Sequence, residues 1–202
     1  MLFDTCRVGF SPPFASMRWW AEAHPTKDRF MSIRFRKTKS NWFIAPSATV
    51  VGDVRIGEQS SIWFNTVIRG DVAAIRIGSR VNVQDNAIIH CDGGVPNVIE
   101  DDVCIGHSAI VHGEFVGTGS LIGMGAKLLG RTKVGRGSLV AAGAVLSPGM
   151  KVPDGMVAMG VPAKIVRAIK PDEIELVKLL VKTYIELAEK YFAGEFDDAA
   201  NV

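Results

Sequence analysis

The chain has little of what marks several common classes of protein. Its 202 residues include only three cysteines and no C-x-x-C pair, so we expect no disulfide framework and a reducing compartment, the cytoplasm. No apolar run approaches the ~18 residues that span a membrane. The formal net charge is only +2, so no basic field covers the whole surface and nucleic acid is not an expected partner.

The first forty residues also lack any sustained periodicity. They mix prolines, aromatic residues and charges, and they end in a basic run from Arg34 to Lys39. We therefore expect residues 1–40 to form a poorly ordered extension. Prolines and arginines interrupt the first thirty residues, and no secretory signal is predicted there.

From Ile44 onward, aliphatic residues recur every six positions. A six-residue period fits neither an α-helix nor a simple alternating strand, but it is typical of a solenoid whose short strands bend at regular corners. Three such strands close a coil of about eighteen residues, so the segment supplies roughly six coils. The series comprises Ile44, Val50, Ile56, Ile62, Ile68, Ile77, Val83, Ile89, Ile99, Ile105, Val111, Val116, Ile122, Leu128, Val134, Val140, Leu146 and Val152.

A single helix is predicted after the solenoid. Pro171 suits its first turn, Asp172 and Glu173 place acid where the helix dipole favours it, and Gly194 suits its end. Its one apolar stripe should pack on the flank of the coil. The predicted boundaries are 41–168 for the solenoid, 169–194 for the helix and 195–202 for a tail.

Three of the four histidines fall in one short stretch of the solenoid. His90 precedes His107 by seventeen residues, close to one coil, and His112 follows five residues later. Rungs of a coil lie about 4.8 Å apart, so these side chains can approach one another. Three imidazoles with one open position are typical of catalytic zinc, although structural histidines are an equal reading of the residues alone. Cys91 or Cys104 could also ligate metal, but a small buried hydrophobe is the simpler reading of Cys104.

Five short motifs contain or surround these histidines. They are Arg69-Gly70-Asp71, Asn82-Val83-Gln84-Asp85, His90, Ile105-Gly106-His107 and Val111-His112-Gly113. Their order resembles the gamma-class carbonic anhydrases, over about three quarters of the chain. The resemblance implies a mainly β protein, a left-handed parallel β-helix with a C-terminal α-helix, assembled as a homotrimer with metal sites between subunits.

The resemblance also implies a role for individual residues. His90 and His112 of one subunit and His107 of its neighbour would hold the metal. Zn²⁺ is expected, and imidazole also suits Fe²⁺ or Co²⁺. The other implied site residues are Gln84, Asn82 and Tyr184, which would serve catalysis, and Arg69, Asp71 and Asp85, which would lie at the subunit interface.

The implied reaction is metal-dependent addition of hydroxide to CO2, giving bicarbonate. Val72 and Gly93 depart from the family pattern, because they stand where its members carry glutamates suited to proton export. We therefore expect slow hydration unless Asp92 or an external buffer accepts the proton. Two alternatives stay open: an acyl-CoA thioesterase or acyltransferase acting on a small acyl substrate, and a noncatalytic assembly or metal-carrying protein.

Overall fold

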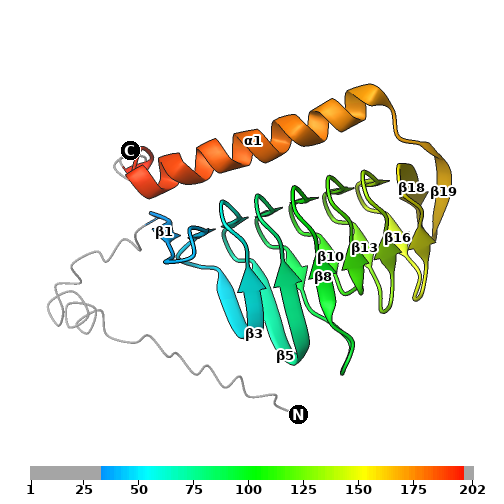
Figure 1. The fold of residues 1–202 in the computed structure, drawn as a ribbon, viewed down its shortest axis with the longest axis horizontal. Coiled ribbons are helices and arrows are strands. Elements are labelled where there is room, and N and C mark those ends of the chain that lie inside the picture. Colours follow the sequence, from blue (N-terminus) through cyan, green and yellow to red (C-terminus); the bar gives the residue numbers. More distant parts are fainter. Residues whose placement is uncertain (1–32, 198–202) are drawn as a thin grey trace, which may run out of the picture. The chain divides into compact units, whose positions relative to one another are not determined.

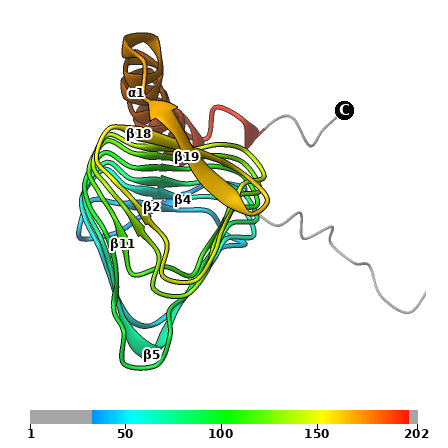
Figure 2. The same ribbon diagram turned by 90° about the vertical axis from the view of Figure 1, so that its right-hand side faces the viewer.

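The computed structural model describes residues 33–197, which lie within one compact unit, Ser32–Val202. Short strands wind there into a left-handed parallel β-helix of about six turns, followed by one helix, α1 (Pro171–Ala193). Figure 1 shows the turns side by side with α1 along them, and Figure 2 shows the triangular cross-section of the coil. The predicted fold class is confirmed. Most of the predicted extension and tail, residues 1–32 and 198–202, lies outside the described residues.

One side of the triangle, which we call the helix face, lies beneath α1 (Figure 2). Its inner strands are parallel and in register from turn to turn, so that Ile122 lies between Ile105 and Val140. Its two outermost strands run antiparallel to their neighbours. In spatial order this sheet contains β1 (Arg36–Lys37), β2 (Phe43–Ile44), β4 (Ser61–Ile62), β6 (Asn82–Val83), β9 (Cys104–Ile105), β12 (Leu121–Ile122), β15 (Leu139–Val140), β18 (Met156–Gly160) and β19 (Ala163–Ala168).

The other two sides of the triangle form a second sheet. Its long strand β5 (Val67–Ile77), paired with β3 (Thr49–Ile56), runs through the corner between them and protrudes at the lower vertex of Figure 2. The open face, on which the described helix does not lie, contains β7 (Ile88–Ile89), β10 (Ile110–Val111), β13 (Lys127–Leu128) and β16 (Val145–Leu146). The side face contains β8 (Asn97–Ile99), β11 (Phe115–Val116), β14 (Lys133–Val134) and β17 (Lys151–Val152).

The six-residue series forms the core of the coil. Each of its aliphatic residues lies on a strand and points inward, and all are buried except Val50 and Ile56, which are partly buried. Parallel register stacks each aliphatic on the one a turn before and after, so the core is continuous along the coil. Glycine follows many of these strands because the corner is crowded: a Cβ at Gly106 would lie 2.6 Å from the backbone nitrogen of Met124.

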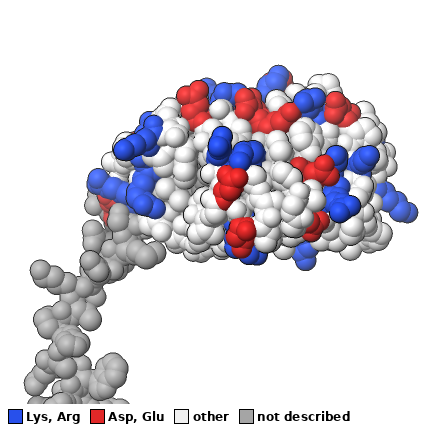
Figure 3. Space-filling model, turned by 60° about the horizontal axis from the view of Figure 1, so that its bottom comes forward, with Lys and Arg blue, Asp and Glu red and all other residues white. Residues whose placement is uncertain are grey.

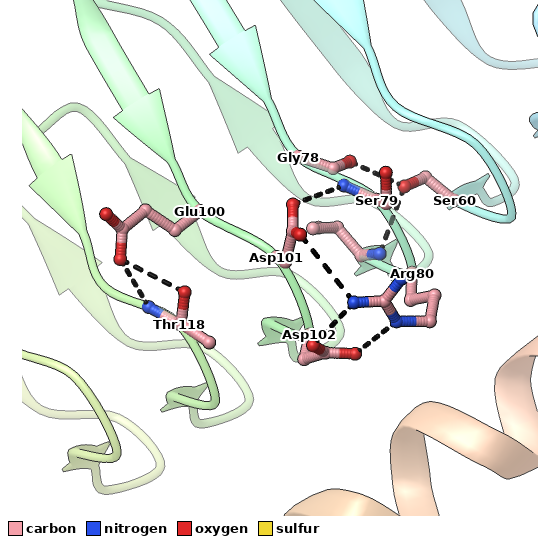
Figure 4. Close-up of polar contacts among 9 residues, drawn as sticks. Ser60, Gly78, Ser79, Arg80, Glu100, Asp101, Asp102 and Thr118 are labelled. Atoms are coloured by element: carbon pink, nitrogen blue, oxygen red, sulfur yellow. Dashed lines mark hydrogen bonds and ion pairs between the residues drawn. The ribbon is translucent and has the colours of Figure 1, made fainter.

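The edge between the side face and the helix face carries a ladder of polar contacts, drawn in Figure 4. Arg80 Nε and Nη2 donate to the two carboxylate oxygens of Asp102 at 2.6 and 2.8 Å, and Asp101 Oδ1 accepts from the Ser79 nitrogen at 2.8 Å. One turn further, Glu100 Oε2 accepts from the backbone nitrogen of Thr118 at 2.9 Å. These polar groups find their partners within the chain, and their contacts connect successive turns.

Helix α1 is fixed at its start by Glu173. This carboxylate accepts from the Lys170 nitrogen at 2.8 Å and from both terminal nitrogens of Arg167 at 2.7 Å. The interaction with Arg167, followed by that with Lys170, lowers the pKa of Glu173 to about 2. Gly194 ends the helix in the left-handed conformation, with φ of 83°. The buried stripe of α1, which includes Val177, packs on β4, β6 and β9.

The structure corrects the predicted extension over residues 33–40. β1 pairs antiparallel with β2, and Phe35 is buried, with its ring centroid 4.8 Å from that of Trp63 and 4.9 Å from that of Tyr191. The prediction of a poorly ordered segment is therefore wrong for these residues. The partners of Phe35 are distant in sequence, and the local pattern does not show them.

Charges of one sign do not dominate the face of the described residues that is drawn in Figure 3. There, Lys and Arg are interspersed with Asp and Glu among uncharged residues. Within residues 33–197, no helix is long and apolar enough to cross a membrane.

Candidate metal centre

His90 and His112 emerge together at the edge between the open face and the side face. His90 follows β7 and His112 follows β10, and these strands are paired in parallel register. The two rings therefore leave the same corner on adjacent turns, with their centroids 5.1 Å apart. We call this edge, with its two histidines, the histidine-pair edge.

Each imidazole of this pair faces a carboxylate. His90 Nε2 lies 3.0 Å from Asp71 Oδ1, and His112 Nε2 lies 3.0 Å from Asp92 Oδ1. Asp71 also forms an ion pair with Arg69. The hydrogen bond with His90, and then that with Arg69, lower the pKa of Asp71. The edge thus combines two imidazoles with two acids.

His107 lies at a different edge, between the helix face and the open face, which we call the His107 edge. It follows β9, and its Nδ1 lies 2.8 Å from Asp85 Oδ2. Its Nε2 lies 3.3 Å from the hydroxyl of Tyr184, which reaches it from α1. Burial, and then the charge of Asp85, raise the pKa of Tyr184 to about 12, so the phenol is neutral at physiological pH.

A chain of buried amides backs the His107 edge. Gln84 Oε1 accepts from the backbone nitrogen of His107 at 3.1 Å, and its Nε2 donates to Asn82 Oδ1 at 2.9 Å. Asn82 in turn donates to the sulfur of Cys104 at 3.0 Å. Burial raises the pKa of the Cys104 thiol to about 11, and it also raises the pKa of the buried Cys91 thiol. Both thiols are buried, and among residues 33–197 neither belongs to a group of side chains arranged to hold a metal ion.

A cavity of about 380 Å³ adjoins this amide chain beneath α1. Its walls are mainly apolar and include Met124, Leu139 and Leu176. Gln84 and Tyr184 also line it and supply polar groups. The cavity is suited to an apolar ligand that needs one or two hydrogen bonds.

Within one chain, His107 does not come together with the histidine pair. Among residues 33–197, no three or more His, Cys, Asp or Glu side chains are arranged to hold a metal ion. Arg69 and Asp85, both expected at the subunit interface, likewise do not pair with each other in one chain, because Arg69 pairs with Asp71 and Asp85 pairs with His107. In both cases, the residues that would have to meet lie on opposite edges of the open face. The imidazole pair fits Zn²⁺, but a third ligand has to come from elsewhere.

No family model matches the chain, whereas individual proteins do. It is 47% identical over 151 residues to the carbonic anhydrase of Geobacillus kaustophilus, an alignment that covers 75% of this chain and 83% of that protein. It is 41% identical over 177 residues to Gamma carbonic anhydrase 2, mitochondrial, of Arabidopsis thaliana, covering 83% of this chain and 64% of that protein. The chain belongs to the gamma carbonic anhydrase family.

The family's fold is shared by proteins with other names. A solved hexapeptide transferase family protein from Anaplasma phagocytophilum superposes with a TM-score of 0.71 at 39% identity, covering 75% of this chain and 90% of that one. The β-helix alone therefore does not separate carbonic anhydrase from acyl transfer, and the distinction depends on the side chains at its edges.

This gamma carbonic anhydrase family member has no acid at the two positions noted in its sequence. Val72 is exposed, and a Cβ at Gly93 would meet no atom within 4 Å. The two positions are neighbours in space, because the nitrogen of Gly94 donates to the carbonyl of Val72 at 3.2 Å. Asp92, beside them, is bound to His112.

Sequence reasoning missed Asn97, which lies inside the coil behind the histidine pair. It also missed the contact between Asp92 and His112. The available signal was the break in the six-residue series at residues 91–97, where an amide occupies a buried strand position.

Proposed function

We propose that this protein is a metal-dependent carbonic anhydrase that converts CO2 to bicarbonate. The observation that carries the proposal is the convergence of His90 and His112 on adjacent turns, with His107 at the opposite edge of the same face, in a chain of this family. Zn²⁺ is the proposed metal, and Fe²⁺ or Co²⁺ would also suit imidazole ligands.

The open face supports a homotrimer. It carries outward apolar residues, Val67, Ile88, Ile110 and Val145, of which Ile88 is 41% exposed. It is bounded by the His107 edge on one side and the histidine-pair edge on the other. Three copies around a threefold axis, with the open faces inward, would bring the His107 edge of each copy to the histidine-pair edge of the next. The same arrangement would bring Arg69 to Asp85.

The chain's own side chains suggest how CO2 would be held. When bound, the metal supplies hydroxide at neutral pH by lowering the pKa of water to about 7. The apolar cavity beneath α1 favours uncharged CO2 over solvent. Gln84 is fixed by His107 and Asn82, and so presents its amide to the cavity in one orientation. Tyr184 stays a neutral hydrogen-bond donor because of its raised pKa.

Proton export is the step that these side chains serve least. Val72 and Gly93 offer no acceptor, and Asp71 and Asp92 are engaged by the histidine pair. We therefore expect hydration to be slow without added buffer base and to rise with imidazole concentration. The decisive measurement is stopped-flow CO2 hydration on protein purified without oxygen, with metal content determined on the same sample.

A gain-of-function variant sharpens this test. Gly93→Glu places a carboxylate in open space, and it should raise turnover in weak buffer by about 100-fold, the lower end of the range for general acid–base catalysis. Gly93→Gln has the same size without the acceptor and should leave the rate unchanged. Turnover that ignores buffer concentration in the wild type would contradict proton export as the limiting step.

A metal-dependent acyl-CoA thioesterase, or an acyltransferase, is the second candidate. The observation that favours it is the cavity itself, since about 380 Å³ lies within the range for much larger ligands than CO2. Incubation with short-chain acyl-CoA, with thiol release as the readout, distinguishes the two. Rapid thioester cleavage that disappears with the metal, in a protein without hydration activity, would favour this candidate.

The cytoplasm is the proposed compartment. It is supported by Cys91 and Cys104, both of which are buried free thiols. The Arabidopsis relative is named as mitochondrial, which makes that organelle the alternative. Fractionation of the native host, followed by immunodetection of the full chain, would decide between them.

A further inference from the structure

One amide lies inside the aliphatic coil directly behind the histidine pair. Asn97 is the first residue of β8 and is fully buried. In the ladder its position pairs with Ile75 of β5, which is an ordinary aliphatic core residue. An asparagine at such a position has to be explained by its hydrogen bonds.

The amide of Asn97 binds the two backbone segments that carry the histidines. Its Nδ2 donates to the carbonyl oxygen of His90 at 2.9 Å and to that of Val111 at 3.1 Å. Val111 directly precedes His112, and its carbonyl also accepts from the His90 nitrogen at 3.2 Å. One side chain thus ties together the peptide units from which both imidazoles emerge.

The backbone needs such a tie at this place. After β7 the chain leaves the repeat through residues 90–96, whereas after β10 it turns through residues 112–114 directly into β11. The two segments diverge just beyond the histidines. Asn97 lies at the end of the longer segment, and its amide donates across the space between the two segments.

The orientation of this amide follows from its partners. If it were reversed, its oxygen would face two carbonyl oxygens, so Nδ2 has to point toward His90 and Val111. The remaining oxygen, Oδ1, is buried without a hydrogen-bond partner among the described residues. A small aliphatic residue would avoid that cost, and the presence of the amide is explained if the two donated bonds serve the site.

We propose that Asn97 is a positioning residue for the metal-ligand pair, holding the backbones of His90 and His112 at the separation that metal binding requires. This inference rests on the proposed metal centre. It differs from a stabilising role because it predicts an effect on metal affinity and coordination beyond the effect on folding.

The test compares two buried polar residues of the same coil. Asn97→Leu keeps the branched shape and removes both donated bonds. Ser138→Ala is the matched control, because the Ser138 hydroxyl is also fully buried and donates to a backbone carbonyl, that of Pro153, at 2.8 Å. Zinc dissociation constants from competition with a chromophoric chelator, visible spectra of the cobalt-loaded proteins and thermal midpoints of the metal-free proteins are measured for both.

We expect Asn97→Leu to weaken zinc binding about tenfold, at the lower end of what outer residues of metal sites contribute, and to change the cobalt spectrum at saturation. Ser138→Ala should lower the thermal midpoint without changing either metal readout. Asn97→Thr retains one hydroxyl donor and a strand-compatible side chain, and should bind zinc with intermediate affinity. It also carries the test if the leucine variant does not fold.

The outcomes separate this inference from the function on which it rests. Wild-type protein that binds no metal overturns the proposed centre and the role of Asn97 with it. Wild-type protein that binds metal, with an unchanged affinity and cobalt spectrum in the folded Asn97 variants, overturns the role of Asn97 alone.

Discussion

The two halves of the solenoid follow different rules. From β11 to β17, every strand has two residues and every corner four, and the inward aliphatics are almost fully buried. Between residues 67 and 112 the repeat is broken by the long strand β5 and by the segment 90–96. All site residues expected from the sequence, except Tyr184, lie in this irregular half. In a strict repeat, few side chains project from the corners. Departures from the repeat therefore mark the positions where a functional site can form.

The largest expected effect comes from removing a proposed metal ligand in the irregular half. His107→Ala should lower zinc affinity by more than about 100-fold, because removing a ligand costs more than removing an outer residue of the site. The metal-free coil should keep its thermal midpoint, since its core is aliphatic and His107 is partly exposed. Elemental analysis after gel filtration measures the metal. Full metal content in the variant would show that His107 is not a ligand.

The next largest effect concerns the folding stability of the regular half, and it should leave the metal affinity unchanged. Leu146 is fully buried on β16, two turns from the strand that precedes His112, and Leu146→Ala should cost about 2–5 kcal/mol of unfolding free energy. For a chain of this size, that corresponds to a fall in melting temperature of roughly 5–15 °C. Zinc affinity below the melting transition should stay the same. Calorimetry and chelator competition measure the two quantities, and a parallel loss of affinity would mean that the halves are coupled.

A smaller effect concerns association between copies. If Arg69 meets Asp85 of another copy, Arg69→Ala should raise the dissociation constant of each subunit contact roughly twofold to fivefold, the range of an exposed ion pair. Light scattering across a dilution series measures the mass. Arg136→Ala, which removes an exposed ion pair with Glu100 at the edge between the side face and the helix face, is the control. A wild-type monomer that holds metal would contradict a site shared between copies.

The smallest effect concerns the start of α1. The folded pKa of Glu173 is about 2, below its ordinary value of 4.5, so its ion pair stabilises the protein above pH 4.5 and the stabilisation is lost as pH falls toward 2. Glu173→Gln should therefore lower the melting temperature by about 2 °C at pH 7, with the difference shrinking below pH 4.5. Glu175→Gln, which removes an exposed contact with Lys178, should change little at any pH. A difference that persists unchanged at pH 3 would exclude the ion pair as its cause.

The sequence predicts the regular features well, because a six-residue period is local and repeated. The period alone places residues such as Ile122 and Leu128 in the core, and Pro171 and Gly194 mark the limits of the α-helix. Contacts between distant segments could not be predicted. The packing of Phe35 and the contact of Asp92 with His112 depend on how the chain returns on itself, and the hydrogen bonds of Asn97 depend on a loop that follows no period.

The antiparallel strands at the two limits of the helix face have a consequence for assembly. A parallel β-helix presents unpaired backbone groups at both of its ends, and the last turn of one copy can add to the first turn of the next without limit, as in a fibril. Here β1 reverses direction against β2, and β19 reverses against β18, so at both limits of the helix face the stack ends in a strand that does not continue the parallel coil. On this face the reversed strands therefore disfavour the addition of a further parallel turn from another copy.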